Sequence, residues 1–334
     1  MVQVVFQVDG QWKIFKNCKQ KKRKIFLFFC FFNLKFIYLH ILNIIVNNFN
    51  YNIININKIN IIIKYMINIY KHISKKNTYI IGDIHGKFLL LRDLIEMRDF
   101  LTNCVLIVAG DCGFGFHSQE YYDKILTELN MTLLKNDVHL YFVRGNHDDP
   151  SYFINEKIKY SNIVAISDYS IIQISNENIL CVGGGISIDR LFRQERDNAQ
   201  REMYKSVGML DNFYPSYWED ELPIDDYEKL KEITDNNIKI DYVISHTSPS
   251  FCCKVGFKGI ESWLSNDINL LVDLQTERSI MDNIYSNLLN LGHNIKKWVY
   301  GHFHVHNDEI IEGVRFITLE HIERGGDIHH LNPN

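Results

Sequence analysis

The chain has 334 residues, of which 46% are hydrophobic and 23% charged, with a formal net charge of −4. This composition is ordinary for a globular protein with a substantial core, and it excludes a highly charged disordered chain. Residues 1–75 carry twelve Lys and Arg against one acid, and the rest carries 24 against 39. An acidic body of this kind disfavours a long nucleic acid as the partner.

The seven cysteines include no CxxC pair, and Cys252 and Cys253 are adjacent. Together with the odd total, this pattern predicts free thiols in a reducing, cytoplasmic compartment. It also argues against a cysteine-based zinc site.

Residues 1–75 form a low-complexity extension rich in Ile, Asn, Lys and Phe. The run 25–46 is long enough to span a bilayer and follows a basic cluster at 19–24, although it contains Lys35. Membrane attachment would depend on residues 25–46 alone. The alternatives are a disordered segment, a small folded module, or an artefact of AT-rich DNA with Met66 as the natural start.

From residue 78 onwards, apolar runs of strand length alternate with helical patterns. Strands are predicted at 78–81, 105–110 and 139–143, and helices at 88–100 and 118–136. This order predicts a sheet covered by helices within a domain that spans residues 76–322, followed by a tail at 323–334.

The second half of this domain shows the same alternation. The segment 189–224 is polar and aromatic, and no element is predicted in it. A hairpin is predicted at 308–320, turning at Glu312 and Gly313. The remaining strands are predicted at 162–167, 171–175, 178–184, 240–245 and 297–301, and the helices at 225–237 and 277–292.

Five of the predicted strands end in side chains that can bind a metal. Because ligands gather at the carboxyl ends of strands in open α/β sheets, we expect these side chains to converge. Carboxylate, imidazole and amide groups suit hard or borderline divalent cations. Each motif alone is more typical of a turn or a cap, but all five in this order favour a metal site. The residues are Asp83, His85, Asp111, Asn146, His246, His302 and His304.

The ordered set "GDIHG … GD … GNHD … H … GHFH" resembles the calcineurin-like metallophosphoesterases over residues 77–320. The stretch "CVGGGISIDR … SYWEDELP … DYVISHTSP" is similar to a bacterial and phage-type subgroup of unassigned substrate. The resemblance implies an α/β fold, a four-layer α/β/β/α sandwich with two mixed β-sheets.

The resemblance also implies two metal ions, Mn, Fe or Zn, divalent or of mixed valence. One ion would be held by Asp83, His85, Asp111 and His304. The other would be held by Asp111, Asn146, His246 and His302, with Asp111 shared. A hydroxide between the ions would attack phosphorus.

The octapeptide "FVRGNHDD" at 142–149 would supply the other catalytic residues. By the resemblance, His147 would protonate the departing oxygen, a role that suits histidine. Asp148 would either orient that imidazole or cap the loop. Arg144 is a candidate phosphate contact, with a solvated or ion-paired arginine as the alternative.

Arg190 is a candidate substrate-binding residue because it follows the glycine-rich turn at 183–185. The phosphoprotein phosphatase branch of the family carries GDxxDRG, whereas here Phe114 and Gly115 take the positions of that Asp and Arg. This difference disfavours a standard Ser/Thr protein phosphatase.

The sequence thus predicts a binuclear-metal-dependent phosphoesterase acting on a small phosphomonoester or a short phosphodiester. The alternatives are a nuclease-type phosphodiesterase and a catalytically idle metal-binding scaffold tethered to a membrane. The sequence does not predict an oligomeric state.

Overall fold

The computed structural model of the chain separates into two compact units, residues 1–66 and residues 67–334. The first unit contains an antiparallel hairpin of β1 (Val4–Val8) and β2 (Gln11–Phe15). The expected membrane segment 25–46 lies outside the described residues. Among the residues that the structure describes, no helix is long and apolar enough to cross a membrane. The described residues are 4–8, 11–15, 67–72, 74–75, 77–154, 157–252, 260–324 and 328–332.

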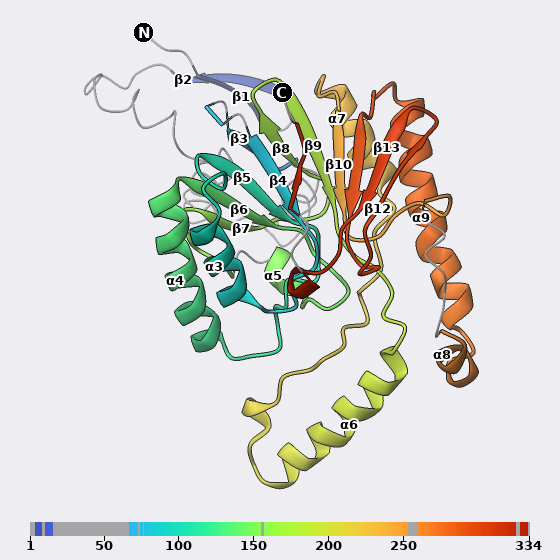
Figure 1. Ribbon diagram of the computed structural model, residues 1–334. Helices are drawn as coiled ribbons and strands as arrows, with labels where there is room; N and C mark the ends of the chain where they lie inside the picture. The colour runs from blue at the N-terminus through green and yellow to red at the C-terminus, as the bar shows by residue number, and fades with distance from the viewer. Residues whose placement is uncertain are drawn as a thin grey trace. The chain divides into compact units, whose positions relative to one another are not determined.

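The second unit contains two mixed β-sheets that lie face to face (Figure 1). In spatial order, the seven-stranded sheet consists of β12 (Asn307–Ile311), β13 (Val314–Thr318), β11 (Lys297–Tyr300), β10 (Tyr242–Ser245), β9 (Glu177–Val182), β8 (Ser170–Ile174) and β3 (Ile69–His72). The five-stranded sheet consists of β14 (Ile328–His330), β4 (Asn77–Ile81), β5 (Cys104–Val108), β6 (Val138–Phe142) and β7 (Ile163–Ala165).

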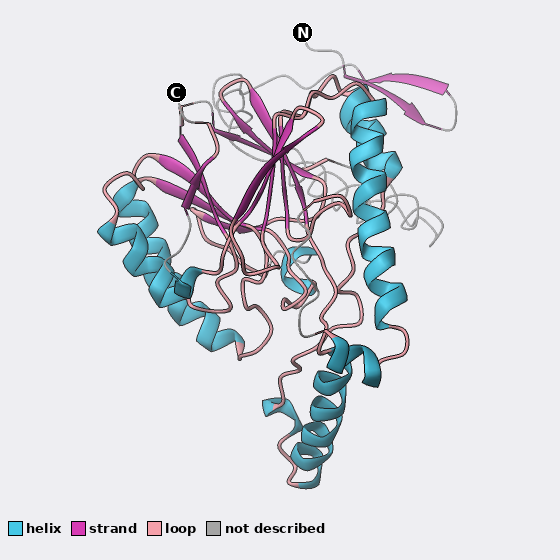
Figure 2. Cartoon of the chain, turned by 45° about the vertical axis from the view of Figure 1, so that its right-hand side comes forward, coloured by secondary structure: helices cyan, strands magenta, loops and turns pink. Residues whose placement is uncertain are grey.

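Helices cover the outer faces of both sheets, while the strands of the two sheets lie between them (Figure 2). The five-stranded sheet is covered by α3 (Phe88–Met97) and α4 (Gln119–Asn136). The seven-stranded sheet is covered by α7 (Tyr227–Asp235) and α9 (Leu270–Asn290). The shorter helices are α5 (Ser151–Ile154), α8 (Glu261–Asn266), η1 (Leu210–Asn212) and η2 (Ile322–Arg324).

Strand β5 shows why four layers form, because it is apolar on both faces. Leu106 and Val108 pack into a core with Phe88 of α3. Val105 and Ile107 face the opposite way, into a core between the two sheets. A strand that is apolar on both sides must be covered on both sides. The predicted α/β/β/α sandwich is therefore confirmed.

Local signals explain several element boundaries. Ser118 caps α4 by accepting a hydrogen bond from the backbone N–H of Tyr121. Asp226 caps α7 in the same way. Glu312 and Gly313 have φ angles of 51° and 86°, as a tight hairpin turn requires, so the predicted hairpin is confirmed.

Three sequence predictions need correction. Helix α6 (Arg190–Ser206) occupies the segment in which no element was predicted, and none of its residues is buried. Strand β3 pairs with β8, so the folded unit begins before residue 76. Strand β14 pairs with β4, which places part of the predicted tail 323–334 in a sheet.

Candidate metal centre

The five predicted segments converge at one edge of the sandwich. Strands β4, β5 and β6 are parallel neighbours in one sheet, and β10 and β11 are parallel neighbours in the other. Their carboxyl ends therefore share an edge, where the loops carry all seven predicted ligands.

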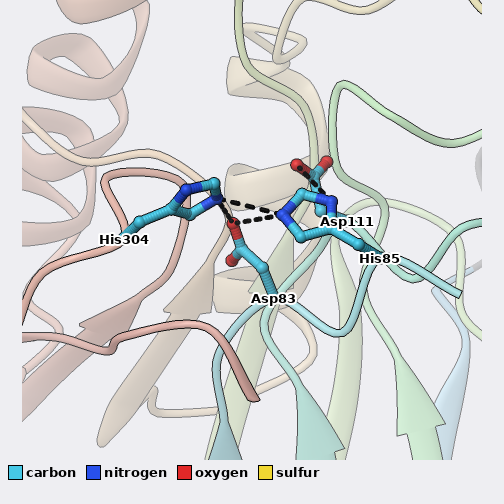
Figure 3. A group of neighbouring side chains, drawn as sticks. All are labelled: Asp83, His85, Asp111 and His304. Atoms are coloured by element: carbon cyan, nitrogen blue, oxygen red, sulfur yellow. Dashed lines mark hydrogen bonds and ion pairs between the residues drawn. The ribbon is translucent and has the colours of Figure 1, made fainter. Parts of the chain in front are cut away.

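Asp83, His85, Asp111 and His304 form one compact group (Figure 3). Their ligand atoms all lie within 4.8 Å of one another. Nε2 of His304 lies 2.9 Å from Oδ2 of Asp83 and 3.0 Å from Nε2 of His85. Because ligands on opposite sides of one cation are about 4 Å apart, these atoms fit a single shared ion.

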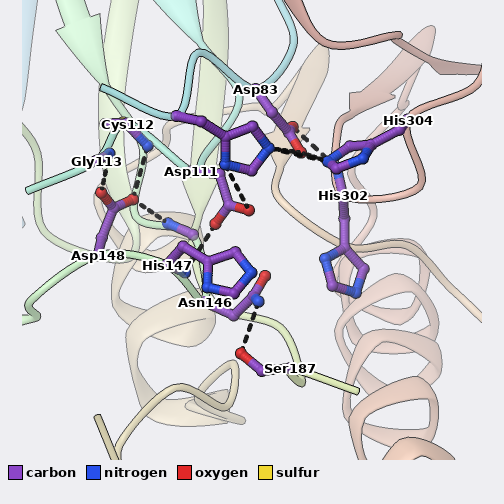
Figure 4. Close-up of polar contacts among 12 residues, drawn as sticks. Asp83, Asp111, Cys112, Gly113, Asn146, His147, Asp148, Ser187, His302 and His304 are labelled. Atoms are coloured by element: carbon purple, nitrogen blue, oxygen red, sulfur yellow. Dashed lines mark hydrogen bonds and ion pairs between the residues drawn. The ribbon is translucent and has the colours of Figure 1, made fainter. Parts of the chain in front are cut away.

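A second group adjoins the first and shares Asp111. Nε2 of His246 lies 3.2 Å from Oδ1 of Asp111 and 2.8 Å from Oδ1 of Asn146. The rings of His246 and His302 lie 4.8 Å apart. The other carboxylate oxygen of Asp111, Oδ2, lies 3.8 Å from Nδ1 of His85 in the first group. Figure 4 shows Asp111 between Asp83 and Asn146.

The buried carboxylate of Asp111 needs a neighbouring positive charge. Burial opposes a charge on either side chain, yet the imidazole of His246 holds the pKa of Asp111 well below its usual range. In turn, despite burial, the carboxylate of Asp111 raises the pKa of His246 to about 10. Metal binding requires deprotonated imidazole, so a divalent cation would replace the proton that His246 otherwise holds. The donor set therefore fits metal ions.

The backbone of the cluster is strained at four of its seven ligands. His85, Asp111, His302 and His304 have φ angles of 44°, 46°, 69° and 52°. Such left-handed conformations cost a non-glycine residue about 1–2 kcal/mol each. Strain of this kind typically gathers at functional sites, which supports the assignment.

Glycines allow the segments to approach one another closely. A Cβ at Gly145 would lie 2.1 Å from Oδ1 of Asp111, and one at Gly301 would lie 2.2 Å from Oδ1 of Asp83. At Gly110, which has a φ of 98°, it would lie 2.0 Å from Nδ1 of His246. Any side chain at these positions would displace a ligand.

The sequence profile of the family described as calcineurin-like phosphoesterase matches residues 76–306. The chain belongs to this family. No curated protein sequence matches it.

Solved structures similar to this calcineurin-like phosphoesterase include a dimetal phosphatase from Danio rerio, with 14% identity over 74% of this chain and 87% of that chain and a TM-score of 0.36. A phosphopantetheinyl hydrolase from Mycobacterium tuberculosis has 15% identity over 79% of this chain and 98% of that chain, with a TM-score of 0.36. The protein TT1561 of Thermus thermophilus has 12% identity over 77% of this chain and 100% of that chain, with a TM-score of 0.38.

His147 lies beside the metal ligands in this phosphoesterase. Its backbone N–H donates to Oδ1 of Asp111 at 2.8 Å, and its ring centre lies 5.9 Å from that of His85. Burial lowers the pKa of His147. Nδ1 of the ring has no hydrogen-bond partner among the described residues, and the side chain lines a cavity beside the cluster.

The structure shows which of its two predicted roles Asp148 has. Its buried carboxylate accepts hydrogen bonds from the backbone N–H groups of Cys112, Gly113, Phe114 and Gly145 at 2.7–3.0 Å. Figure 4 shows the first two of these bonds. Burial and the neighbouring Asp111 raise its pKa to about 7. Asp148 therefore caps the loop, and the prediction that it is a catalytic residue is not supported.

Arg144 also has a structural role. Its buried guanidinium donates to the carbonyl oxygens of Asp220, Glu221 and Leu222 and forms an ion pair of 3.1 Å with Asp168. These contacts occupy both terminal nitrogens. The ion-paired alternative is therefore observed, and a phosphate contact by Arg144 is not supported.

Arg190 points to two carboxylates of the neighbouring helices. Its guanidinium forms ion pairs of 2.6 Å with both Asp267 and Asp273. Arg190 does not line the cavity beside the cluster. Arg190 of α6 thus links this helix to the end of α8 and to α9. Substrate contact by Arg190 is not supported.

Two residues that the sequence does not predict, Ser187 and Glu221, orient Asn146. Nδ2 of Asn146 donates to the Ser187 hydroxyl at 2.8 Å, and that hydroxyl donates to Oε2 of Glu221 at 2.6 Å. All three side chains are buried. Because Ser187 fixes the amide nitrogen, the amide oxygen faces His246. Ser187 follows the glycine-rich turn, but no local pattern marks Glu221, which is 34 positions away.

Proposed function

We propose that this calcineurin-like phosphoesterase is a hydrolase of small phosphomonoesters or short phosphodiesters that uses two metal ions. The observation that carries the proposal is the position of Asp111, whose two carboxylate oxygens face different groups of ligands. One carboxylate between two ligand sets is the arrangement expected of a two-metal site.

When bound, the metal ions would lower the pKa of a water molecule and neutralise the phosphoryl oxygens. Asp83, His85 and His304 would hold one ion, and Asn146, His246 and His302 would hold the other. Manganese, iron and zinc all suit these oxygen and nitrogen donors.

The roles of the other residues follow from their contacts. His147 would hold the proton for the departing oxygen, because its ring lines the cavity beside the ligands. Ser187 and Glu221 would keep the oxygen of Asn146 turned toward the metal. Asp148 would keep the loop that carries Asn146 and His147 against the loop of Asp111.

The preference for small substrates is supported by charge. Residues 76–334 carry 24 bases against 39 acids. A long polyanion would gain little counterion release from such a surface, whereas two metal ions can hold one phosphoryl group.

Comparing the rates of hydrolysis of p-nitrophenyl phosphate and bis(p-nitrophenyl) phosphate by the manganese-loaded chain tests the proposal. A faster rate on the first identifies a monoesterase, and a faster rate on the second identifies a diesterase. Hydrolysis of neither, with both metal sites filled, would identify an idle scaffold and contradict the proposal. Preferential cleavage of long single-stranded DNA would instead support a nuclease.

A further inference from the structure

A cavity of about 340 Å³ borders the metal cluster. Asp111, Asn146, His147, His302 and His304 all line it. This volume is at the lower end of the range for small-molecule sites. An ester whose phosphorus lies beside these residues can place its organic group in the rest of this cavity.

The cavity also has an apolar wall. It is formed by Ile186, Ile188, Ile260, Leu274 and Phe303, which come from four separate segments of the chain. Ile186, Ile260 and Leu274 belong to a small hydrophobic core of their own. The apolar wall is therefore a packed part of the fold.

Three charged side chains, Asp189, Glu277 and Arg278, also line this part of the cavity, and each has partners; Asp189 forms an ion pair of 2.8 Å with Arg193. Arg278 is the only Lys or Arg among the described lining residues, and it lies over the ring of Phe303 at 4.5 Å. Its Nη1 donates to Ser248 O and Oγ at 2.7 Å. Glu277 accepts hydrogen bonds from the Ile186 N–H and the Thr247 hydroxyl, both at 2.6 Å.

We infer that this cavity selects phosphate esters whose leaving group is compact and apolar, such as an aryl or branched alkyl group, over esters of strongly hydrophilic alcohols. This inference rests on the proposed function. A sugar or glycerol group would bury hydroxyl groups against Ile260, Leu274 and Phe303. The polar side chains of the same cavity already bond to other protein groups, so this burial costs affinity. An apolar group gains affinity there, and burying about 60 Å² of it is enough for about a tenfold effect.

Phosphonates provide the test because they are not hydrolysed, so the reactivity of the leaving group does not affect the result. The inhibition constants of benzylphosphonate, methylphosphonate and 2-hydroxyethylphosphonate are measured on the manganese-loaded full chain. We expect benzylphosphonate to bind at least about tenfold more tightly than either of the others. Equal constants would overturn the inference.

A pair of matched variants locates the selectivity. Ile188→Asn changes a wall residue that is 41% exposed, so folding should survive, and it should lower the benzyl preference about threefold or more. Ile310→Asn changes an isoleucine that is 73% exposed and does not line the cavity, and it should leave the preference unchanged. An equal preference in both variants would overturn the role of the wall.

The same measurements separate this inference from the proposed function. Hydrolysis of p-nitrophenyl phosphate together with equal inhibition constants would contradict the inference alone. Calorimetric binding that favours benzylphosphonate without any hydrolysis would contradict the proposed function and support the selectivity of the cavity.

Discussion

Oδ1 of Asp111 lies 3.2 Å from Nε2 of His246, and both side chains are buried. Because Asp111 also faces His85, loss of its charge should weaken both metal sites. We expect Asp111→Asn to lower kcat/KM for p-nitrophenyl phosphate by at least about 100-fold. Calorimetric titration with manganese should show weaker binding of both ions. Full loading of two ions at unchanged affinity would contradict the shared role of Asp111.

His147→Ala tests the proton donor. The variant should retain both metal ions, because His147 is not a predicted ligand, and it should lose about 10²- to 10⁴-fold in rate. The loss should be largest for esters of weakly acidic alcohols, which depend most on a donated proton. Measuring the rates of both proteins on esters whose alcohols differ in pKa checks this dependence on the leaving group. If metal content falls instead, His147 is a ligand and its assigned role is wrong.

Ser187→Ala tests the orientation of Asn146. Removing the hydroxyl frees the amide to rotate, so metal affinity should fall by about 10- to 100-fold. Ser187→Thr, which keeps a hydroxyl, should restore part of the affinity. Ser170→Ala is the matched control, since Ser170 is equally buried on β8 and bonds to Ser167. Equal metal affinities in the Ser187 and Ser170 variants would show that Ser187 has only a packing role.

Arg144→Met distinguishes a structural from a catalytic arginine. Removing the buried cation takes a hydrogen-bond donor from Asp168 and from three carbonyl groups, so the free energy of unfolding should fall by about 3–5 kcal/mol. KM of the folded fraction should not change. Urea denaturation and steady-state kinetics provide the two measurements, with Arg98→Met as an exposed control. A raised KM with unchanged stability would instead show that Arg144 contacts the phosphate.

Two histidines outside the predicted ligand set, His72 and His329, should make stability depend on pH. Burial lowers the pKa of both His72 and His329 to about 4 in the folded protein, whereas an unfolded histidine titrates near 6.5. The unfolded chain therefore binds more protons in this window. Stability should be complete above about pH 6.5 and fall toward pH 4, by at most about 1.4 kcal/mol per pH unit for each residue.

Urea denaturation at several pH values measures this dependence. His72→Gln should reduce the slope between pH 6.5 and 4, because it removes one of the two groups. His117→Gln replaces an exposed imidazole and should leave the slope as it is. An unchanged slope in the His72 variant would contradict the assignment.

The convergence of the seven predicted ligands could be anticipated because each one lies within a few residues of the end of an apolar strand. The carboxyl ends of neighbouring parallel strands lie at the same edge of a sheet, so residues that follow different strands come close together. The contacts of Arg144 and Arg190 could not be predicted, for the opposite reason. An arginine side chain is long, and its partners come from distant segments, Asp168 for Arg144 and Asp267 for Arg190. Helix α6 could not be predicted because most of its residues are polar and none of them is buried, so no apolar run marks it.

The left-handed backbone at His85, Asp111, His302 and His304 implies a trade-off between thermal stability and activity. Glycine at any of these four positions would relieve the backbone strain, but it would also remove a side chain that is predicted to bind metal. Selection for heat resistance alone should therefore erode the site first. A screen that selects variants only for remaining folded at high temperature would recover more stable but inactive variants, with substitutions concentrated at these four positions.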